Sequence, residues 1–327
     1  MRGQIAVAVV LALPTQLGAT VADCGGCFCI PEEGESCPDF EPVDTFSDEL
    51  IEEFKSKALL NPFSDLTCDP YTDLNCDTSP ARELVGLEGA VCAFKYSSDP
   101  TMCSAYEMES YPSEEAALAD GAFVTHLGAC GLCSTAQDLA AYMANPDMTS
   151  AGKKCATKGI INEHWGKKCY EDLGFTPPCA TIWNYDGVYD GKECAWTCIR
   201  NLRSDNNGPP PLCELNDCLQ CDEDKAGPAF KDFAGRTRRR SGLPSAIARS
   251  CSEFPQIIHE PCPEVEEVAV TEEVKAETKE EEQKDKGGDK LSTGLKSSCW
   301  DELSDCESWC GNACSLYPTP YGPIYCC

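Results

Sequence analysis

Cysteine is the feature of this sequence that most limits how the chain can fold. There are 26 cysteines, an even number, and the first of them is Cys24. In an exported protein this frequency predicts a disulfide framework rather than free thiols. Each bridge contributes about 2–4 kcal/mol by restricting the unfolded chain, so bridges can replace a large apolar core. Structural zinc is the competing use of cysteine, but such use is more typical of cytosolic proteins.

Residues 1–22 have the pattern of a secretory signal peptide. Arg2 is positively charged, residues 5–13 form an apolar run, and Thr20 and Ala22 are small residues before the expected cleavage site. The apolar run is shorter than the roughly 20 residues that a membrane-spanning helix needs. We therefore expect no membrane span and a location outside the cell or in an oxidising lumen of the secretory pathway. A retained signal anchor is the alternative.

The chain is strongly acidic, with 55 acidic and 26 basic residues and a formal net charge of −29. Binding to phosphate groups needs Lys and Arg that displace counterions, so this charge opposes binding to nucleic acid and to anionic membranes. We expect no nucleic-acid partner. The charge favours solubility and association with cations.

The distribution of cysteine and charge divides the chain into five segments. The body has helical periodicity, and alternation of β-branched residues is scarce. A stretch without cysteine or aromatic residues, rich in Glu and Lys, follows the body, and its composition predicts disorder. We predict a mainly α, disulfide-rich fold with a signal peptide (1–22), a cysteine-rich loop (23–46), a helical cystine-braced domain (47–262), an acidic disordered linker (263–298) and a six-cysteine mini-module (299–327).

Capping residues predict where several helices of the body begin. Ser47 precedes Asp-Glu-Leu, Ser113 precedes two glutamates, and Ser134 opens a match to the capping box, STAQ. The last of these helices should end at Asn145-Pro146. We expect further short helices around residues 160–173, 192–202, 212–224, 228–234 and 243–252.

Cys130 and Cys133 form a CGLC motif just before a predicted helix start, and this is the most enzyme-like feature. A Cys-x-x-Cys pair at a helix N-terminus can have a lowered thiol pKa and carry out thiol–disulfide exchange. His126 would then serve as a base, or as a metal ligand. Thioredoxin-type chemistry also needs a strand that leads into the motif, and the pattern shows none. Because the same spacing occurs at 24–27 and 218–221, structural cystine is the simpler interpretation.

Four arginines lie within five residues, in the sequence RTRRR. One interpretation is a turn whose arginines are solvated or paired with acids, and another is a dibasic processing site of the R-x-R-R type. The third is an anion pocket, because guanidinium groups bind sulfate, phosphate or carboxylate in a bidentate manner. We take this cluster as the preferred contact for an anionic ligand; its members are Arg236, Arg238, Arg239 and Arg240.

Two aspartates, Asp186 and Asp190, are each followed by glycine, and Glu193 lies close behind. Clustered carboxylates can hold Ca²⁺, but this spacing differs from that of the EF-hand loop. Asp-Gly pairs commonly form turns, so we interpret the segment as two turns and the three acids as a weak calcium candidate. The acidic run at 222–224 is a similar candidate. No other cofactor is expected.

The last six cysteines lie within residues 299–327, a segment too short to fold without crosslinks. Cysteines recur every four residues at 306–314, which would place them on one face of a helix. Tyr317, Tyr321 and Tyr325 have the same spacing in a proline-rich segment. An exposed row of these rings would suit binding to a polysaccharide; the alternative is that the rings form the core of the module.

Several strings of the body are similar to known sequences. They are THLGACGLCSTAQDLAAYM, GKKCYEDLGFTPPCATIWNYDGVYDGKEC, LNDCLQCDEDKAGPAF and AGRTRRRSGL. They resemble uncharacterised secreted cysteine-rich proteins of marine algae and other protists, over roughly Leu66 to Cys251. The resemblance implies export and a shared disulfide domain. It implies no activity, so no catalytic residue is carried over.

The chain contains no hydrolase or nucleotide-binding signature and only three histidines. Our leading hypothesis is a secreted, disulfide-rich binding or structural protein without enzymatic activity, which binds an anionic ligand or a polysaccharide. The alternative is a thiol–disulfide oxidoreductase of the secretory pathway that uses Cys130 and Cys133. A third class is an enzyme based on Asp and Glu chemistry, but acids are too abundant here to single out a pair. The pattern predicts neither the cysteine pairing nor the ligand.

Overall fold

The computed structural model describes residues 24, 26–39, 43, 45–73, 75–76, 84–97, 103–201 and 203–262, and the backbone of three strands near the C-terminus. The predicted signal peptide and acidic linker lie outside the described residues. The chain divides into two units, residues 1–265 and 266–327, and each is considered by itself. Within the described part of the first unit, helices α1–α9 predominate and ten disulfides link the cysteines. A mainly α, disulfide-rich protein is confirmed.

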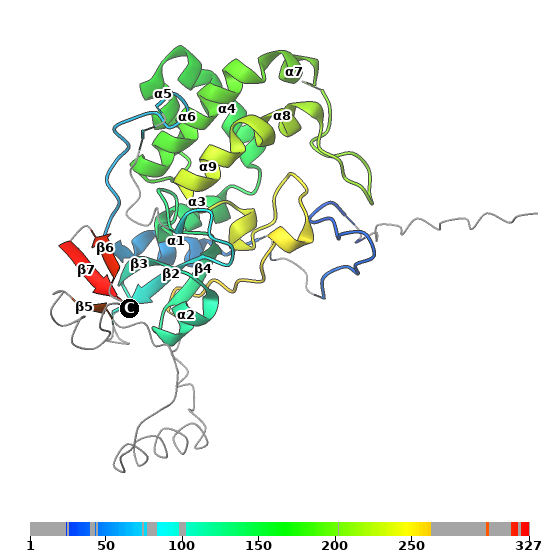
Figure 1. Ribbon diagram of the computed structural model, residues 1–327. Coiled ribbons are helices and arrows are strands. Elements are labelled where there is room, and N and C mark those ends of the chain that lie inside the picture. The colour runs from blue at the N-terminus through cyan, green and yellow to red at the C-terminus, as the bar shows by residue number, and fades with distance from the viewer. Residues whose placement is uncertain are drawn as a thin grey trace, which may run out of the picture. The chain divides into compact units, whose positions relative to one another are not determined.

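The first unit also contains a four-stranded sheet that the sequence did not predict (Figure 1). Strand β1 pairs with β3 in parallel, and β3, β2 and β4 pair antiparallel. In β3, buried Tyr106 and Met108 alternate with exposed Glu107 and Glu109, which is the period of a half-buried strand. This alternation is visible in the sequence, but the strand contains no β-branched residue and therefore did not predict a strand. The strands are β1 (Ala58–Leu59), β2 (Val91–Tyr96), β3 (Ala105–Tyr111) and β4 (Phe123–Leu127).

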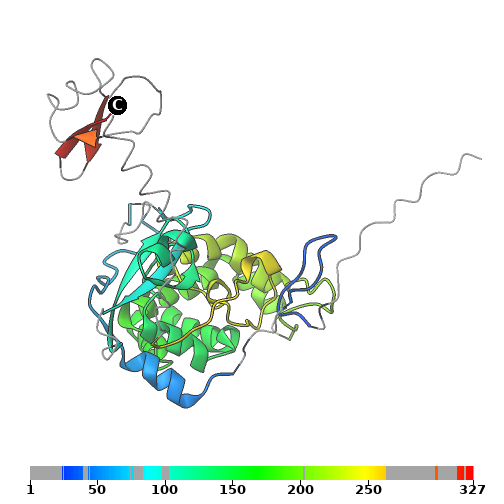
Figure 2. The same ribbon diagram turned by 90° about the horizontal axis from the view of Figure 1, so that it is seen from below.

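The two faces of this sheet pack against different helices. On β2, Cys92 and Phe94 belong to the main core together with buried residues of α1 (Asp48–Ser56) and α3 (Ala136–Ala144). Val91 and Ala93 instead join a small cluster with Ala117 of α2 (Glu114–Ala119). Successive strand residues point to opposite faces, so α2 covers the face turned away from the remaining helices (Figures 1 and 2).

The predicted helix starts are largely confirmed. The Ser47 hydroxyl accepts a hydrogen bond from the Leu50 amide at 3.2 Å, and Ser113 caps α2 in the same way. Helix α3 begins one residue later than expected, with Thr135 as its N-cap. The reason is that the Ser134 hydroxyl accepts the Gly131 amide at 2.8 Å and faces inward.

Six helices make up the second half of this unit. The expected helix at 160–173 is divided, because Asn162 ends α4 and its side chain caps α5 by accepting the Trp165 amide. The expected helix at 243–252 is wrong; only a short 3₁₀ turn at Cys251–Glu253 forms there. The six helices are α4 (Met148–Ile161), α5 (Glu163–Glu171), α6 (Pro177–Glu193), α7 (Ala195–Arg200), α8 (Asp217–Lys225) and α9 (Gly227–Ala234).

The two Asp-Gly pairs do not form turns, and both lie inside the long helix α6. A Cβ atom on Gly187 would lie 2.7 Å from the Cβ of Ala156, and one on Gly191 would lie 2.6 Å from Cδ1 of Ile160. Both contacts are with α4. The missing side chains therefore allow α4 to approach α6 closely, and this packing outweighs the helix penalty of about 1 kcal/mol per glycine.

Disulfides join segments that are far apart in the sequence. Cys27–Cys213 and Cys29–Cys251 attach the N-terminal loop to the end of the body, across 186 and 222 residues. Free cysteines are absent from the described residues. The other pairs are Cys24–Cys37, Cys68–Cys76, Cys92–Cys130, Cys103–Cys262, Cys133–Cys179, Cys155–Cys169, Cys194–Cys221 and Cys198–Cys218.

The C-terminal unit contains a three-stranded antiparallel sheet with the order β5-β7-β6, formed by Cys299–Trp300, Gly322–Cys326 and Ser315–Thr319. Tyr317 pairs with Ile324, whereas Tyr325 pairs with Leu316. Only the backbone of these strands is described, so the expected row of tyrosines stays a prediction. Tyr321 and the cysteines at 306–314 lie outside the described residues.

Candidate functional site

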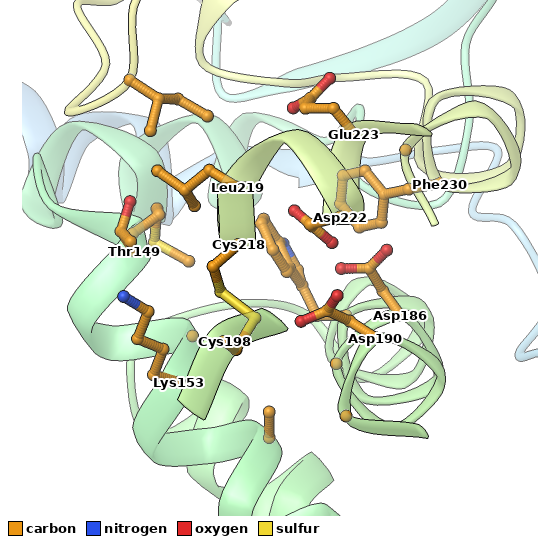
Figure 3. Close-up of a pocket in the computed structure, with 18 of the residues that line it drawn as sticks. Thr149, Lys153, Asp186, Asp190, Cys198, Cys218, Leu219, Asp222, Glu223 and Phe230 are labelled. Atoms are coloured by element: carbon orange, nitrogen blue, oxygen red, sulfur yellow. A yellow bond between two sulfur atoms is a disulfide. The ribbon is translucent and has the colours of Figure 1, made fainter. Parts of the chain in front are cut away.

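The six helices of the second half surround a cavity of about 480 Å³ (Figure 3). Its lining is mainly apolar and aromatic, and includes Met148, Tyr170, Trp183, Leu219 and Phe230. Exposed residues of α4 also line it, so the cavity opens to solvent along that helix. A concave space of this volume, with apolar walls and few polar groups, is typical of small-molecule sites.

Three carboxyl groups meet at one side of this cavity (Figure 3). Asp186 and Asp190 are one turn apart on α6 and so share a helix face, and Asp222 extends toward them from α8. Asp186 is 9% exposed, and its Oδ1 atom lies 2.7 Å from the Tyr71 hydroxyl, which donates to it. The Tyr71 ring stacks on Tyr189 with ring centroids 4.7 Å apart.

These three carboxyl groups, hereafter the aspartate trio, form no salt bridge with a residue that the structure describes. Lys153 and Arg249 are near enough to oppose the rise in the pKa of Asp190 and of Asp222, respectively. The Oδ1 atom of Asp190 is buried without a hydrogen-bond partner. The adjacent residue, Glu223, shows the opposite situation. Its carboxylate pairs with Lys231 at 3.3 Å, with Arg239 at 3.7 Å and closely with Arg249. Its side chain also points away from the trio (Figure 3).

Burial and mutual repulsion shift the acidity of the aspartate trio. Burial raises the pKa of Asp186, and the negative charges of Asp190 and Glu223 add to the effect. Burial raises the pKa of Asp190 to about 6. The pKa of Asp222 is raised by burial and by the charges of Asp186 and Asp190. Burial also acts on Glu223, but Arg249, Lys231 and Arg239 outweigh it and lower the pKa of that carboxyl. Carboxyl groups with raised pKa values in a cleft are characteristic of functional sites.

The weak calcium candidate is only partly assembled. Asp186 and Asp190 line the cavity, but Glu193 is exposed and lies outside its lining. The third carboxyl group at the cavity is instead that of Asp222, which belongs to the acidic run at 222–224. Among the residues with a described position, no group of three or more His, Cys, Asp or Glu side chains is arranged to hold a metal ion. Two of the three acids of the calcium candidate thus lie together at the cavity, and calcium binding stays a prediction.

The arginine cluster is not an open anion site. Arg236 is completely buried, and Arg238 and Arg239 are 6% and 8% exposed. Arg238 donates to the carbonyl oxygens of Pro244 at 2.6 Å and of Tyr142. Arg239 pairs with acids, and Arg240 donates to the carbonyl oxygens of Lys231 and Gly235. The donors expected to bind an anionic ligand thus bind the protein itself, because the turn folds inward against the body.

The arginine cluster and the CGLC motif are direct neighbours, although about a hundred residues separate them. The amides of Leu132 and Cys133 donate to the carbonyl oxygens of Phe233 and Ala234, both at 2.9 Å. A Cβ atom on Gly235 would lie 2.5 Å from the Gly131 nitrogen, and its φ of 70° is one that glycine adopts readily. Only glycine allows these two segments to approach so closely.

Cys130 and Cys133 do not bond to each other. Cys130 pairs with Cys92 of β2, and Cys133 pairs with Cys179 of α6. A strand, β4, does lead into the motif, but both cysteines are buried, at 2% and 0% exposed. His126 is also fully buried, with its ring nitrogens 2.7 Å from the Ser134 hydroxyl and 2.8 Å from the Leu127 carbonyl oxygen. The geometry contains no exposed dithiol and so gives no support to thiol–disulfide exchange here.

This pairing leads to a first prediction. Peptide mapping without reduction is expected to recover Cys92–Cys130 and Cys133–Cys179 as the linked peptides, since the Cys130 and Cys133 side chains serve different segments. The two sulfurs should also resist millimolar dithiothreitol in the folded protein, because their burial blocks thiolate attack. Recovery of a Cys130–Cys133 linkage, or its rapid reduction, would restore the oxidoreductase hypothesis. The Cys24–Cys37 bridge, whose two cysteines are only partly buried, provides an internal comparison for reduction.

No helix within the described ranges has both the length and the apolar character needed to cross a membrane.

Comparison with known proteins gives one match. A family of unknown function (DUF8771) matches residues 163–257, less than a third of the chain. The matched segment contains the aspartate trio, Glu223 and the arginine cluster. It is compatible with the resemblance noted from the sequence, and it names neither a relative nor an activity. No curated protein and no solved structure matches the chain.

Proposed function

We propose that this disulfide-rich, extracellular-type protein binds a small molecule in the cavity that helices α4 to α9 surround. The observation that carries the proposal is the cavity itself, about 480 Å³ in volume and lined mainly by apolar and aromatic side chains. Apolar side chains that line a solvent-open cavity are unfavourable in water, and a ligand with an apolar body would remove them from it. A binding role explains why the fold keeps this apolar lining.

The frame around the cavity supports this proposal. Cys198–Cys218 joins α7 to α8 and forms part of the lining, and Cys194–Cys221 links the start of α7 to α8. A site held by crosslinks loses little conformational entropy when a ligand binds, so more of the contact energy remains as affinity. Secretion, which the signal-like N-terminus predicts, belongs to the same proposal.

The test is titration with N-phenyl-1-naphthylamine, an uncharged apolar fluorophore small enough for the cavity. We expect saturable binding to the wild type with enhanced fluorescence. The same titration is carried out on the variant Gly152→Phe. Gly152 lines the cavity, and a Cβ atom there would have no atom within 4 Å, so a phenyl ring can enter the empty space without disturbing the helix. The affinity of this variant should fall at least about tenfold, the effect of losing one well-buried ring contact.

The matched control is Lys154→Phe, which adds the same ring to an exposed position of α4 outside the lining. This variant should bind like the wild type. Equal binding by the wild type and Gly152→Phe would show that the fluorophore binds elsewhere, and absence of binding to the wild type would contradict the proposal.

A further inference from the structure

We propose that the ligand of this cavity is an organic ammonium ion, an amine with an apolar or aromatic body, whose charged nitrogen is held by the aspartate trio. This inference rests on the small-molecule binding proposed above. It assigns the trio as the charged end of the site and the aromatic walls as the apolar end.

Charge compensation favours a cationic ligand. Glu223, next to Asp222 in the chain, has three cationic partners, whereas the trio has no salt bridge to any described residue. Asp186 is nine-tenths buried and accepts a hydrogen bond from the neutral Tyr71 hydroxyl only, and a buried oxygen of Asp190 has no hydrogen-bond partner. Buried carboxylates without partners are unfavourable unless they are protonated or a cation joins them. A bound ammonium group would supply both the charge and the missing hydrogen-bond donors.

The size and chemistry of the cavity favour an organic cation over a metal ion. A metal ion occupies far less than 480 Å³ and needs a closed oxygen shell, which the described side chains do not form. The lining also contains the aromatic residues Trp183, Tyr170 and Phe230, and aromatic rings attract cations as well as apolar groups. The combination fits a molecule with one cationic group and an apolar body.

Long-range attraction also favours a cation. The formal net charge of −29 concentrates cations around the protein and repels anions. This attraction comes from the chain as a whole, because α4 at the opening carries Lys153, Lys154 and Lys158 and no acid.

The ammonium ion requires ionised carboxylates, so its binding should depend on pH. Burial raises the pKa values of the trio, and Asp190 titrates at about 6. Binding of a cation favours the ionised form and releases protons, so the affinity for an amine should rise as the pH increases from 5 to 8. The other titratable or charged groups near the trio are Tyr71 from the Cys68–Cys76 loop, Lys153 on α4, Tyr170 on α5, Glu223 on α8 and Arg249 beyond α9.

The test compares 4-phenylbutylamine with 4-phenylbutan-1-ol, which differ only in the ammonium group. At pH 8, calorimetry should show the amine binding about 10- to 100-fold more tightly, the usual value of charge-assisted hydrogen bonds. The variant Asp222→Asn should reduce the affinity for the amine about tenfold and leave that for the alcohol unchanged. Asp222 makes no side-chain hydrogen bond to a described residue, so this variant should fold normally. Lowering the pH to 5 should remove most of the preference for the amine.

The control variant is Asp224→Asn, which makes the same charge change at an exposed position of α8 and should leave both affinities unchanged. Equal binding of the amine and the alcohol at pH 8 would overturn the ammonium assignment while leaving small-molecule binding intact. Displacement of the amine by millimolar Ca²⁺ but not by Na⁺ of equal ionic strength would assign the trio to a metal instead. Failure of both probes and of the fluorophore to bind would remove both proposals together.

Discussion

Replacing Arg236 with methionine is expected to lower the free energy of unfolding by about 3–5 kcal/mol, because several buried oxygen atoms lose their donor at once. The Arg236 side chain is completely buried and its five N–H groups are all donated. Methionine has a similar length but donates nothing. The acceptors, at 2.6–3.2 Å, are the carbonyl oxygens of Thr125, Cys133 and Ser134 and the hydroxyl groups of Thr125 and Ser241.

Chemical denaturation under non-reducing conditions would measure this change. The control is Arg203→Met, at an exposed position, where we expect a change within about 0.5 kcal/mol. Arg236→Lys keeps the charge but has three donors in another geometry, so it should lie between the wild type and the methionine variant. A loss below about 1 kcal/mol for Arg236→Met would show that the guanidinium group does not tie β4, the CGLC motif and the arginine cluster together.

Replacing Gly166 with alanine is expected to destabilise the protein by about 3 kcal/mol, although alanine is the better helix former. A Cβ atom at Gly166 of α5 would lie 1.9 Å from Oδ1 of the buried Asn184 and 2.5 Å from the Cα atom of Gly159. The second atom belongs to the α4 backbone and cannot move away alone. Helices α4, α5 and α6 would have to separate.

The matched control is Gly152→Ala on α4, where a Cβ atom meets nothing within 4 Å. Here the substitution should stabilise the protein by up to about 1 kcal/mol, through helix propensity alone. Thermal unfolding of both variants would therefore give shifts of opposite sign. A rise in the melting temperature for Gly166→Ala would show that the three helices are not in close contact at this position.

Local signals in the sequence predicted local features of the structure. Ser47 and Ser113 cap helices where the pattern placed them, because a cap depends on a side chain and amides two or three residues away. The high and even number of cysteines predicted that they form disulfides. This prediction depends on composition and not on which segments meet. The mainly α class followed from the same short-range patterns.

Features that depend on which segments meet could not be predicted in this way. The pairing of Cys130 and Cys133 with different partners requires knowledge of β2 and α6. The Asp-Gly pairs resemble turns because the packing of α4 that favours glycine in α6 is not visible locally. The arginine cluster resembles a surface patch because most acceptors of Arg236 lie about a hundred residues earlier in the chain.

The aspartate trio shows most clearly the difference between local sequence signals and contacts between distant segments. With 55 acidic residues, the sequence could not distinguish Asp222 from its neighbour Glu223. The fold distinguishes them, since the Asp222 carboxyl lines the cavity without a salt bridge to a described residue, whereas the Glu223 carboxyl pairs with three cations. The sequence by itself thus determined the crosslinked, helical character of the protein. Only the tertiary structure decided where the candidate site lies, because burial and charge compensation are properties of the assembled chain and not of any segment.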